Sequence, residues 1–135
     1  MRAKFFLMLE VIVLLVFGLS FIIDAQWSMS LFGLTLDQGG IVMTQLVGAG
    51  FVSIAILDWF ARNVNVYGDA FPVLMANFFM NAIGFVVLLV HKLAGLGNNW
   101  TWIPIALYLL FALAFGYCLL VKSSIETRIV RPRHA

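Results

Sequence analysis

Charged residues are scarce in this sequence of 135 amino acids. Only 10% of the residues are Asp, Glu, Lys or Arg, whereas 64% are hydrophobic, and a typical soluble domain contains about 25% charged residues. A soluble domain of this size has too much surface for its volume to bury so many apolar side chains. The composition therefore excludes an ordinary soluble domain and predicts a protein that lipid surrounds.

Cysteine and histidine are also nearly absent. The single cysteine, Cys118, excludes an intramolecular disulfide, a CxxC redox pair and a cysteine-based zinc site. The two histidines are His91 and His134, and the second lies beyond the last hydrophobic run, which excludes a bis-histidine haem within the membrane. The sequence contains neither HExxH nor GxSxG. We therefore expect no enzyme activity, no metal site and no cofactor.

Long hydrophobic runs dominate what is present. About 20 mostly apolar residues are needed for a helix to cross the hydrocarbon core of a bilayer. Four runs of this length are bounded by polar or turn-forming residues, at 5–23, 41–61, 71–91 and 103–121. They predict an all-α, integral membrane four-helix bundle that forms one domain over 1–135, with a basic tail at 122–135.

The first run also has features of a signal peptide, because Met1-Arg2-Ala3-Lys4 resembles a basic n-region. Its apolar stretch is longer than the ~7–15 residues that are usual in such peptides. It contains Glu10, and Ile23-Asp24-Ala25 matches a cleavage site poorly. A membrane-spanning helix is the better interpretation.

The positive charges predict an orientation. Lys92 alone falls in the first or third loop, and the other Lys and Arg residues fall in the N-terminus, the second loop and the tail: Arg2, Lys4, Arg62, Lys122, Arg128, Arg131 and Arg133. The positive-inside rule then places both termini on the cytoplasmic side, of what we expect to be a bacterial inner membrane. Each basic residue of the tail would gain about 1 kcal/mol from anionic lipid headgroups. We expect membrane lipids as partners and no nucleic acid.

The longest loop, 24–40, is too apolar for a free loop. Trp27-Ser28-Met29-Ser30-Leu31 alternates between apolar and polar residues, and Phe32-Gly33-Leu34 follows. We expect this loop either to lie on the outer membrane surface or to fold back over the mouth of the bundle.

Polar residues inside the spans are candidate functional residues, because lipid offers them no hydration. An inner group consists of Glu10, Asp58, Asn77 and Tyr117, and an outer group of Gln45, Tyr108 and His91. At about 1.5 Å per residue, Glu10 and Asn77 lie at nearly the same depth. Arg62 follows Asp58 by four residues, so an ion pair between them is the simplest prediction, with Glu10 as an alternative partner for Arg62.

The third span carries Asn77, Asn81, Gly84 and His91 on one helical face, which should point into the bundle. For Asn77, Asn81 and Gln45, interhelical packing is favoured over ligand contact, and His91 is interpreted as an interfacial residue. Gly48, Gly50, Gly84 and the Ala112-x-x-x-Gly116 pattern are expected to allow close helix approach.

Glu10 has two interpretations. Burial favours the neutral form of a carboxyl group, and a neutral Glu10 can donate a hydrogen bond to Asn77 in a purely structural role. A Glu10 that titrates can instead couple proton movement to the binding of a substrate.

Part of the sequence resembles the small four-helix bacterial membrane proteins loosely grouped as DoxX-like. The resemblance rests on Gly18, the long first loop, and Gln45-x-x-Gly48-Ala49-Gly50 followed by Asp58-Trp59 and Arg62. It covers about the first half of the chain and implies a four-helix fold. Gln45 stands where the family pattern leads us to expect an arginine, which weakens the transfer of a quinone-linked role.

Glu10-Val11 also resembles the first helix of the small multidrug resistance transporters, in which a glutamate binds protons and cationic drugs. The long first loop, the basic tail and the strong charge bias differ from that family. The resemblance implies an alternative function, the proton-coupled export of small molecules by a homodimer that uses Glu10.

The sequence thus favours a non-enzymatic membrane protein. We expect it to act as an accessory subunit of a larger membrane complex or to bind a lipid-like or quinone-like ligand. The candidate ligand- or proton-binding residues are Glu10, Asn77, Asn81, Gln45, Asp58, Arg62 and Tyr117.

Overall fold

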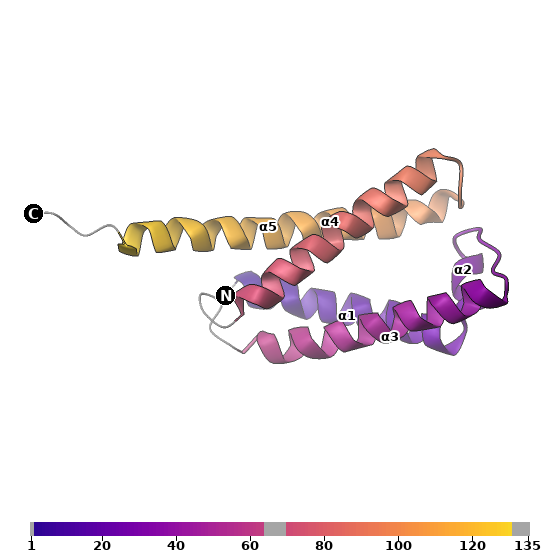
Figure 1. Cartoon of the computed structure of the whole chain (residues 1–135), viewed down its shortest axis with the longest axis horizontal. Helices are drawn as coiled ribbons and strands as arrows, with labels where there is room; N and C mark the ends of the chain where they lie inside the picture. The colour runs from indigo at the N-terminus through magenta and orange to yellow at the C-terminus, as the bar shows by residue number, and fades with distance from the viewer. Residues whose placement is uncertain (1, 64–69, 131–135) are drawn as a thin grey trace, which may run out of the picture.

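A computed structural model shows four long helices and no strand in the residues it describes, 2–63 and 70–130 (Figure 1). Side chains are described for residues 3–63 and 70–121. The long helices are α1 (Arg2–Ile23), α3 (Gln38–Ala61), α4 (Phe71–Leu93) and α5 (Trp102–Val130), and two short helices, α2 (Ala25–Ser30) and η1 (Asn99–Thr101), lie between them. All four long helices are long and apolar enough to cross a membrane. The predicted all-α, four-helix class is confirmed.

The helix bounds agree closely with the hydrophobic runs, apart from the last helix. Its backbone continues from residue 121 to Val130, through most of the predicted basic tail. Arg131 and Arg133 of that tail lie outside the described residues. The apolar run therefore predicts the part of α5 that is apolar enough to lie in lipid, and the helix continues beyond this part to Val130.

Glycines bring α1 and α3 into direct contact. A Cβ atom on Gly18 would lie 2.9 Å from the carbonyl oxygen of Gly48, and a Cβ on Gly48 would lie 2.7 Å from that of Gly18. The two backbones therefore touch where neither has a side chain, as small residues allow in membrane helices. Gly50 has open space around it, so the expectation of close approach is met at Gly48 and not at Gly50.

The second helix pair is α4 with α5. The ring of Tyr108 lies over Gly84, where an added Cβ would come within 2.6 Å of the ring, and Phe78 packs beside Gly116. Both glycines thus accept an aromatic ring from the neighbouring helix, which is the close packing that the sequence predicts for them.

The two pairs meet at one end of the molecule and diverge at the other (Figure 1). We call the first the terminal end, where α1 begins and α3 passes to α4, and the second the loop end, where α2 and η1 lie. A buried cluster at the terminal end takes residues from all four long helices: Ala3, Leu7, Ala61, Leu74, Phe111, Phe115 and Cys118. The bundle is therefore closed at the terminal end and open between the pairs toward the loop end.

The first loop folds back over the open mouth. Asn98, which follows α4, donates hydrogen bonds from its backbone N–H to Phe32 O (2.9 Å) and from its side chain to Leu31 O (2.9 Å). The ring of Phe32 stacks on that of Phe17 in α1. Of the two placements expected for this loop, the structure has the one over the bundle mouth.

Candidate functional site

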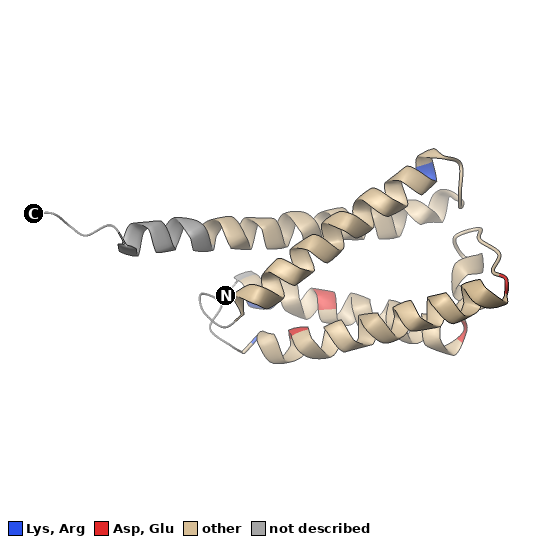
Figure 2. Ribbon diagram, viewed as in Figure 1, with Lys and Arg blue, Asp and Glu red and all other residues tan. Residues whose placement is uncertain are grey.

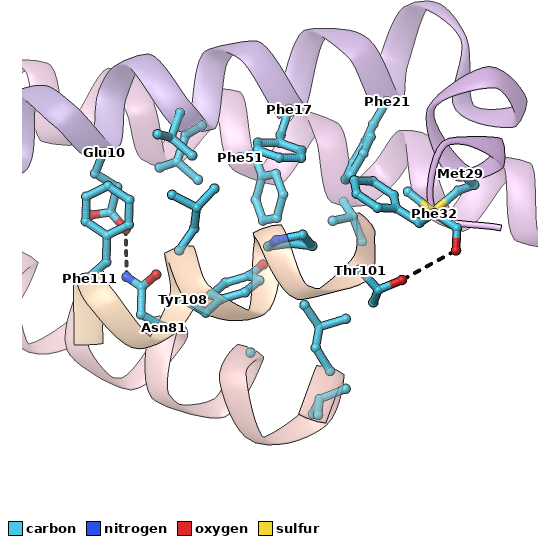
Figure 3. Close-up of a pocket in the computed structure, with 18 of the residues that line it drawn as sticks. Glu10, Phe17, Phe21, Met29, Phe32, Phe51, Asn81, Thr101, Tyr108 and Phe111 are labelled. Atoms are coloured by element: carbon cyan, nitrogen blue, oxygen red, sulfur yellow. Dashed lines mark hydrogen bonds between the residues drawn. The ribbon is translucent and has the colours of Figure 1, made fainter. Parts of the chain in front are cut away.

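A cavity of about 390 Å³ lies between the two helix pairs. Most of its wall is aromatic or aliphatic, and Figure 3 shows the rings pointing into it from α1, α3, α5 and the first loop. Its aromatic and sulfur-containing lining includes Phe17, Phe21, Met29, Phe32, Phe51 and Phe111. Such a wall suits an apolar molecule.

A few polar groups interrupt this wall at defined places (Figure 3). Glu10 and Asn81 stand together at the end nearer the terminal end, and Thr101 lies at the other, where its hydroxyl faces Phe32 O at 3.4 Å. Tyr108 lies between them. Binding sites for small molecules typically combine an apolar wall with a small number of polar groups that fix orientation.

Glu10 forms part of the cavity wall and also belongs to a buried polar cluster of four side chains from three helices. Asn81 donates to Glu10 Oε1 at 2.6 Å and to the backbone carbonyl of Asn77 at 2.8 Å. Asn77 donates to Asp58 Oδ1 at 2.6 Å. The cluster, which we call the carboxyl–asparagine cluster, therefore links α1 and α3 to the inner face of α4.

The two carboxyl groups of the cluster face each other and are fully shielded. Glu10 is 1% exposed and Asp58 is 0% exposed, and the two groups lie within hydrogen-bonding reach of each other. Their remaining oxygens, Glu10 Oε2 and Asp58 Oδ2, are buried and receive no N–H or O–H donor from the described residues. In Figure 2, red acidic positions lie on both α1 and α3, the helices that carry Glu10 and Asp58.

The partners differ from those that the sequence predicts. Counting residues pairs Glu10 with Asn77, but the structure pairs Glu10 with Asn81 and Asn77 with Asp58. Helical side chains lean toward the N-terminus of their own helix, so Asn81 in α4 leans toward the terminal end. Asp58 leans the opposite way because α3 runs antiparallel to α4, and this brings Asp58 to the level of Glu10.

Arg62 does not pair with Asp58 or with Glu10 in the described structure. Its guanidinium donates to Met8 Sδ (3.1 Å) and to Trp59 O (3.1 Å), and it lies 3.5 Å from the centre of the Trp59 ring. Asp58 turns into the bundle toward Asn77, whereas Arg62 lies half-buried against Met8 and Trp59. The i, i+4 spacing thus allows an ion pair that the structure does not form.

The other candidate residues lie apart from the carboxyl–asparagine cluster. Gln45 is exposed and donates to Ile22 O at 3.3 Å, which joins α3 to α1. Tyr117 is 46% exposed and is not among the cavity residues. His91 is exposed near the loop end, with Nδ1 2.8 Å from Val87 O. The structure therefore brings together Glu10, Asp58, Asn77 and Asn81, and leaves Gln45, Tyr117 and Arg62 outside.

Sequence reasoning missed the aromatic wall of the cavity. Phe17, Phe21 and Phe51 resemble any other apolar residues of membrane spans, and nothing in their spacing distinguishes a cavity from a filled core. The one available signal was the apolar first loop, since Met29 and Phe32 contribute to the wall. Tyr108 was noted as a polar residue near the outer surface, but its position between Glu10 and Thr101 needs the fold.

No family model, no curated protein and no solved structure matches this sequence. The resemblances to DoxX-like proteins and to small multidrug resistance transporters stay predictions.

Proposed function

We propose that the protein binds an apolar ligand with a hydrogen-bonding head group, lipid-like or quinone-like, within the membrane. The cavity between the helix pairs carries this proposal. Its volume of about 390 Å³ falls in the range of roughly 300–1,000 Å³ that is usual for small-molecule sites. An apolar body would lie among the phenylalanine rings, and the head group would reach Glu10, Asn81 or Tyr108.

The route into the cavity supports a ligand that comes from lipid. Val47 in α3 and Val87 in α4 both line the cavity, and each is 48% exposed. They lie on helices that contact each other little. An opening between α3 and α4, on an apolar face of the bundle, would let a lipid-soluble molecule enter the cavity without crossing water.

The distribution of positive charge supports an N-in, C-in arrangement, and the bacterial inner membrane stays a prediction. The helix bounds place Lys4 and Arg62 at the terminal end, and Asp24, Asp37 and Lys92 at the loop end. Figure 2 shows the charged positions gathered toward the helix ends, apart from acidic positions within α1 and α3. With the positive-inside rule, the terminal end faces the cytoplasm and the mouth that the first loop covers faces outward.

The ligand is expected to co-purify with the protein. The full chain is purified in a mild detergent, and its organic extract is compared by mass spectrometry with an extract of detergent micelles alone. A lipid or quinone enriched in about one-to-one ratio supports the proposal. Protein that carries nothing above the micelle background contradicts it.

A substitution that fills the cavity is expected to exclude this ligand. Val87→Trp places an indole into the wall and should reduce the bound ligand at least tenfold. Val86→Trp is the matched control, because Val86 is 55% exposed and does not line the cavity. Equal ligand content in the two variants would show that the ligand binds elsewhere on the protein.

A second candidate function is the proton-coupled export of small hydrophobic molecules. It is favoured by the position of Glu10, whose carboxyl group belongs both to the cavity wall and to the buried cluster. A carboxyl in that position can exchange a proton when a substrate arrives.

Under this second proposal, Glu10→Gln is expected to abolish proton-driven uptake of a lipophilic dye into inverted vesicles, because an amide cannot release a proton. Asp24→Asn is the control, since Asp24 is exposed at the start of α2 and asparagine also caps helices. Transport that persists in Glu10→Gln would rule out this function while leaving ligand binding open.

A further inference from the structure

If both acids of the carboxyl–asparagine cluster were ionised, the cluster would contain more hydrogen-bond acceptors than donors. Each asparagine amide satisfies one carboxyl oxygen, Glu10 Oε1 or Asp58 Oδ1. The other two oxygens are buried and lack a donor among the described residues. Two ionised carboxylates in contact would both accept and neither would donate, and the apolar surroundings would strengthen their repulsion.

No described cation is placed to neutralise the pair. On α1, Lys4 is exposed at the terminal end. On α3, Arg62 is turned to Met8 and Trp59. α4 presents the neutral Asn77 and Asn81, and α5 presents Tyr108, a neutral phenol, from across the cavity. With no cation beside it among the described side chains, the pair can balance its charge by holding a bound species itself.

We propose that Glu10 and Asp58 form a proton-binding site in which one proton is shared between the two carboxyl groups. The proton comes from water as the site forms and returns to water when the site opens, and the O–H bond is the only covalent bond made or broken. Sharing turns the repulsion into a charge-assisted hydrogen bond, as in other carboxyl pairs in close contact. The asparagine amides hold the outer oxygens, so both groups are oriented toward each other.

The position of the two carboxyl groups connects the shared proton to the packing of the helices and to the cavity. The carboxyl–asparagine cluster joins the α1–α3 pair to α4 near the closed end of the cavity, and Glu10 forms part of the cavity wall. Loss of the shared proton would place two negative charges at this junction. The proposal does not rest on the proposed ligand, because the two carboxyl groups are buried together by the protein's own helices.

Infrared spectroscopy of the full chain in phosphatidylcholine vesicles tests the shared proton. At pH 7 in sodium-free buffer, we expect a carbonyl band of a protonated carboxyl group that shifts to lower frequency in D₂O. The band should be lost in both Glu10→Gln and Asp58→Asn, because each new amide can donate to the remaining carboxylate and replace the proton. Asp24→Asn should keep it, since Asp24 is exposed.

Three results would overturn the proposal. Absence of such a band in the wild type means that both groups are ionised. A decrease of the band when Na⁺ is added means that the pair binds a metal cation. Persistence of the band in both Glu10→Gln and Asp58→Asn would place the protonated carboxyl elsewhere. The first two results need the wild type only, so they remain decisive if a variant does not fold.

Discussion

Replacing Gly48 by leucine is expected to separate α1 from α3 and to destabilise the protein by about 3 kcal/mol, the upper part of the usual range for overpacking. A Cβ at this position would lie 2.7 Å from Gly18 O and 2.9 Å from the Cβ of Phe21. The first contact is with backbone, so no change of rotamer relieves it and the helices must move apart. Unfolding of the reconstituted protein by SDS in mixed micelles measures the loss.

Gly50→Leu provides a matched control two residues away on the same helix. A Cβ on Gly50 meets nothing within 4 Å, while both substitutions gain the same helix propensity, about 1 kcal/mol for glycine to a good helix former. We therefore expect Gly50→Leu to leave stability unchanged or to raise it slightly. Equal stability of the two variants would show that α1 and α3 do not touch at the Gly18–Gly48 contact.

The Gly48→Leu substitution should also alter the cavity. Phe21 lines the cavity and packs against Gly48, and its ring lies 5.9 Å from that of Phe51. A leucine at position 48 would push Phe21 away from α3 and change the shape of the wall. Reduced ligand content in the folded fraction of Gly48→Leu would connect the close packing of the first helix pair to ligand binding.

The positions of the long helices were predictable because hydrophobicity alone decides them. A run of apolar residues must lie in lipid, and its length must match the bilayer, so the start and end of each run lie within a few residues of α1, α3 and α4. The short helix α2 was not predicted. It depends on local capping, in which Asp24 accepts from Trp27 N, and on the fold-back of the loop.

The composition of the carboxyl–asparagine cluster was largely predictable, but its pairing was not. Glu10, Asp58, Asn77 and Asn81 stood out because polar residues in spans must find partners. Which partner each finds depends on helix tilt, rotation and side-chain lean, and no sequence spacing reports these. Arg62 illustrates the limit, since an ion pair that the spacing favours gives way to contacts with Met8 and Trp59.

The cavity was beyond prediction for a related reason. It exists because the helix pairs diverge toward the loop end, and the divergence reflects where bulky and small residues meet across helices. Gly18 and Gly48 draw α1 to α3, and Gly84 receives Tyr108 from α5. No glycine of the described residues makes a comparable contact between α3 and α4. Space therefore remains between the pairs toward the loop end, and the first loop covers it.

Asn77→Leu is expected to produce the other large effect, a destabilisation on the order of 2 kcal/mol. The substitution removes the amide that donates to Asp58 Oδ1 at 2.6 Å and leaves a fully buried carboxyl with no donor from α4. Interhelical hydrogen bonds in membranes average less than this, because the unfolded chain finds other partners there. The hydrogen bond to Asp58 should contribute more than this average, because an acid in lipid is costly to leave without a donor.

Ala76→Leu tests whether this loss is specific to the cluster. Ala76 is the adjacent residue on α4 and is exposed, so leucine there adds apolar surface toward lipid without touching Asp58. SDS unfolding should show little change in Ala76→Leu and a clear loss in Asn77→Leu. If Asn77→Leu is as stable as the wild type, Asp58 does not need the amide. In that case the junction between α4 and the α1–α3 pair rests on apolar packing around Leu74 and Phe111 rather than on the carboxyl–asparagine cluster.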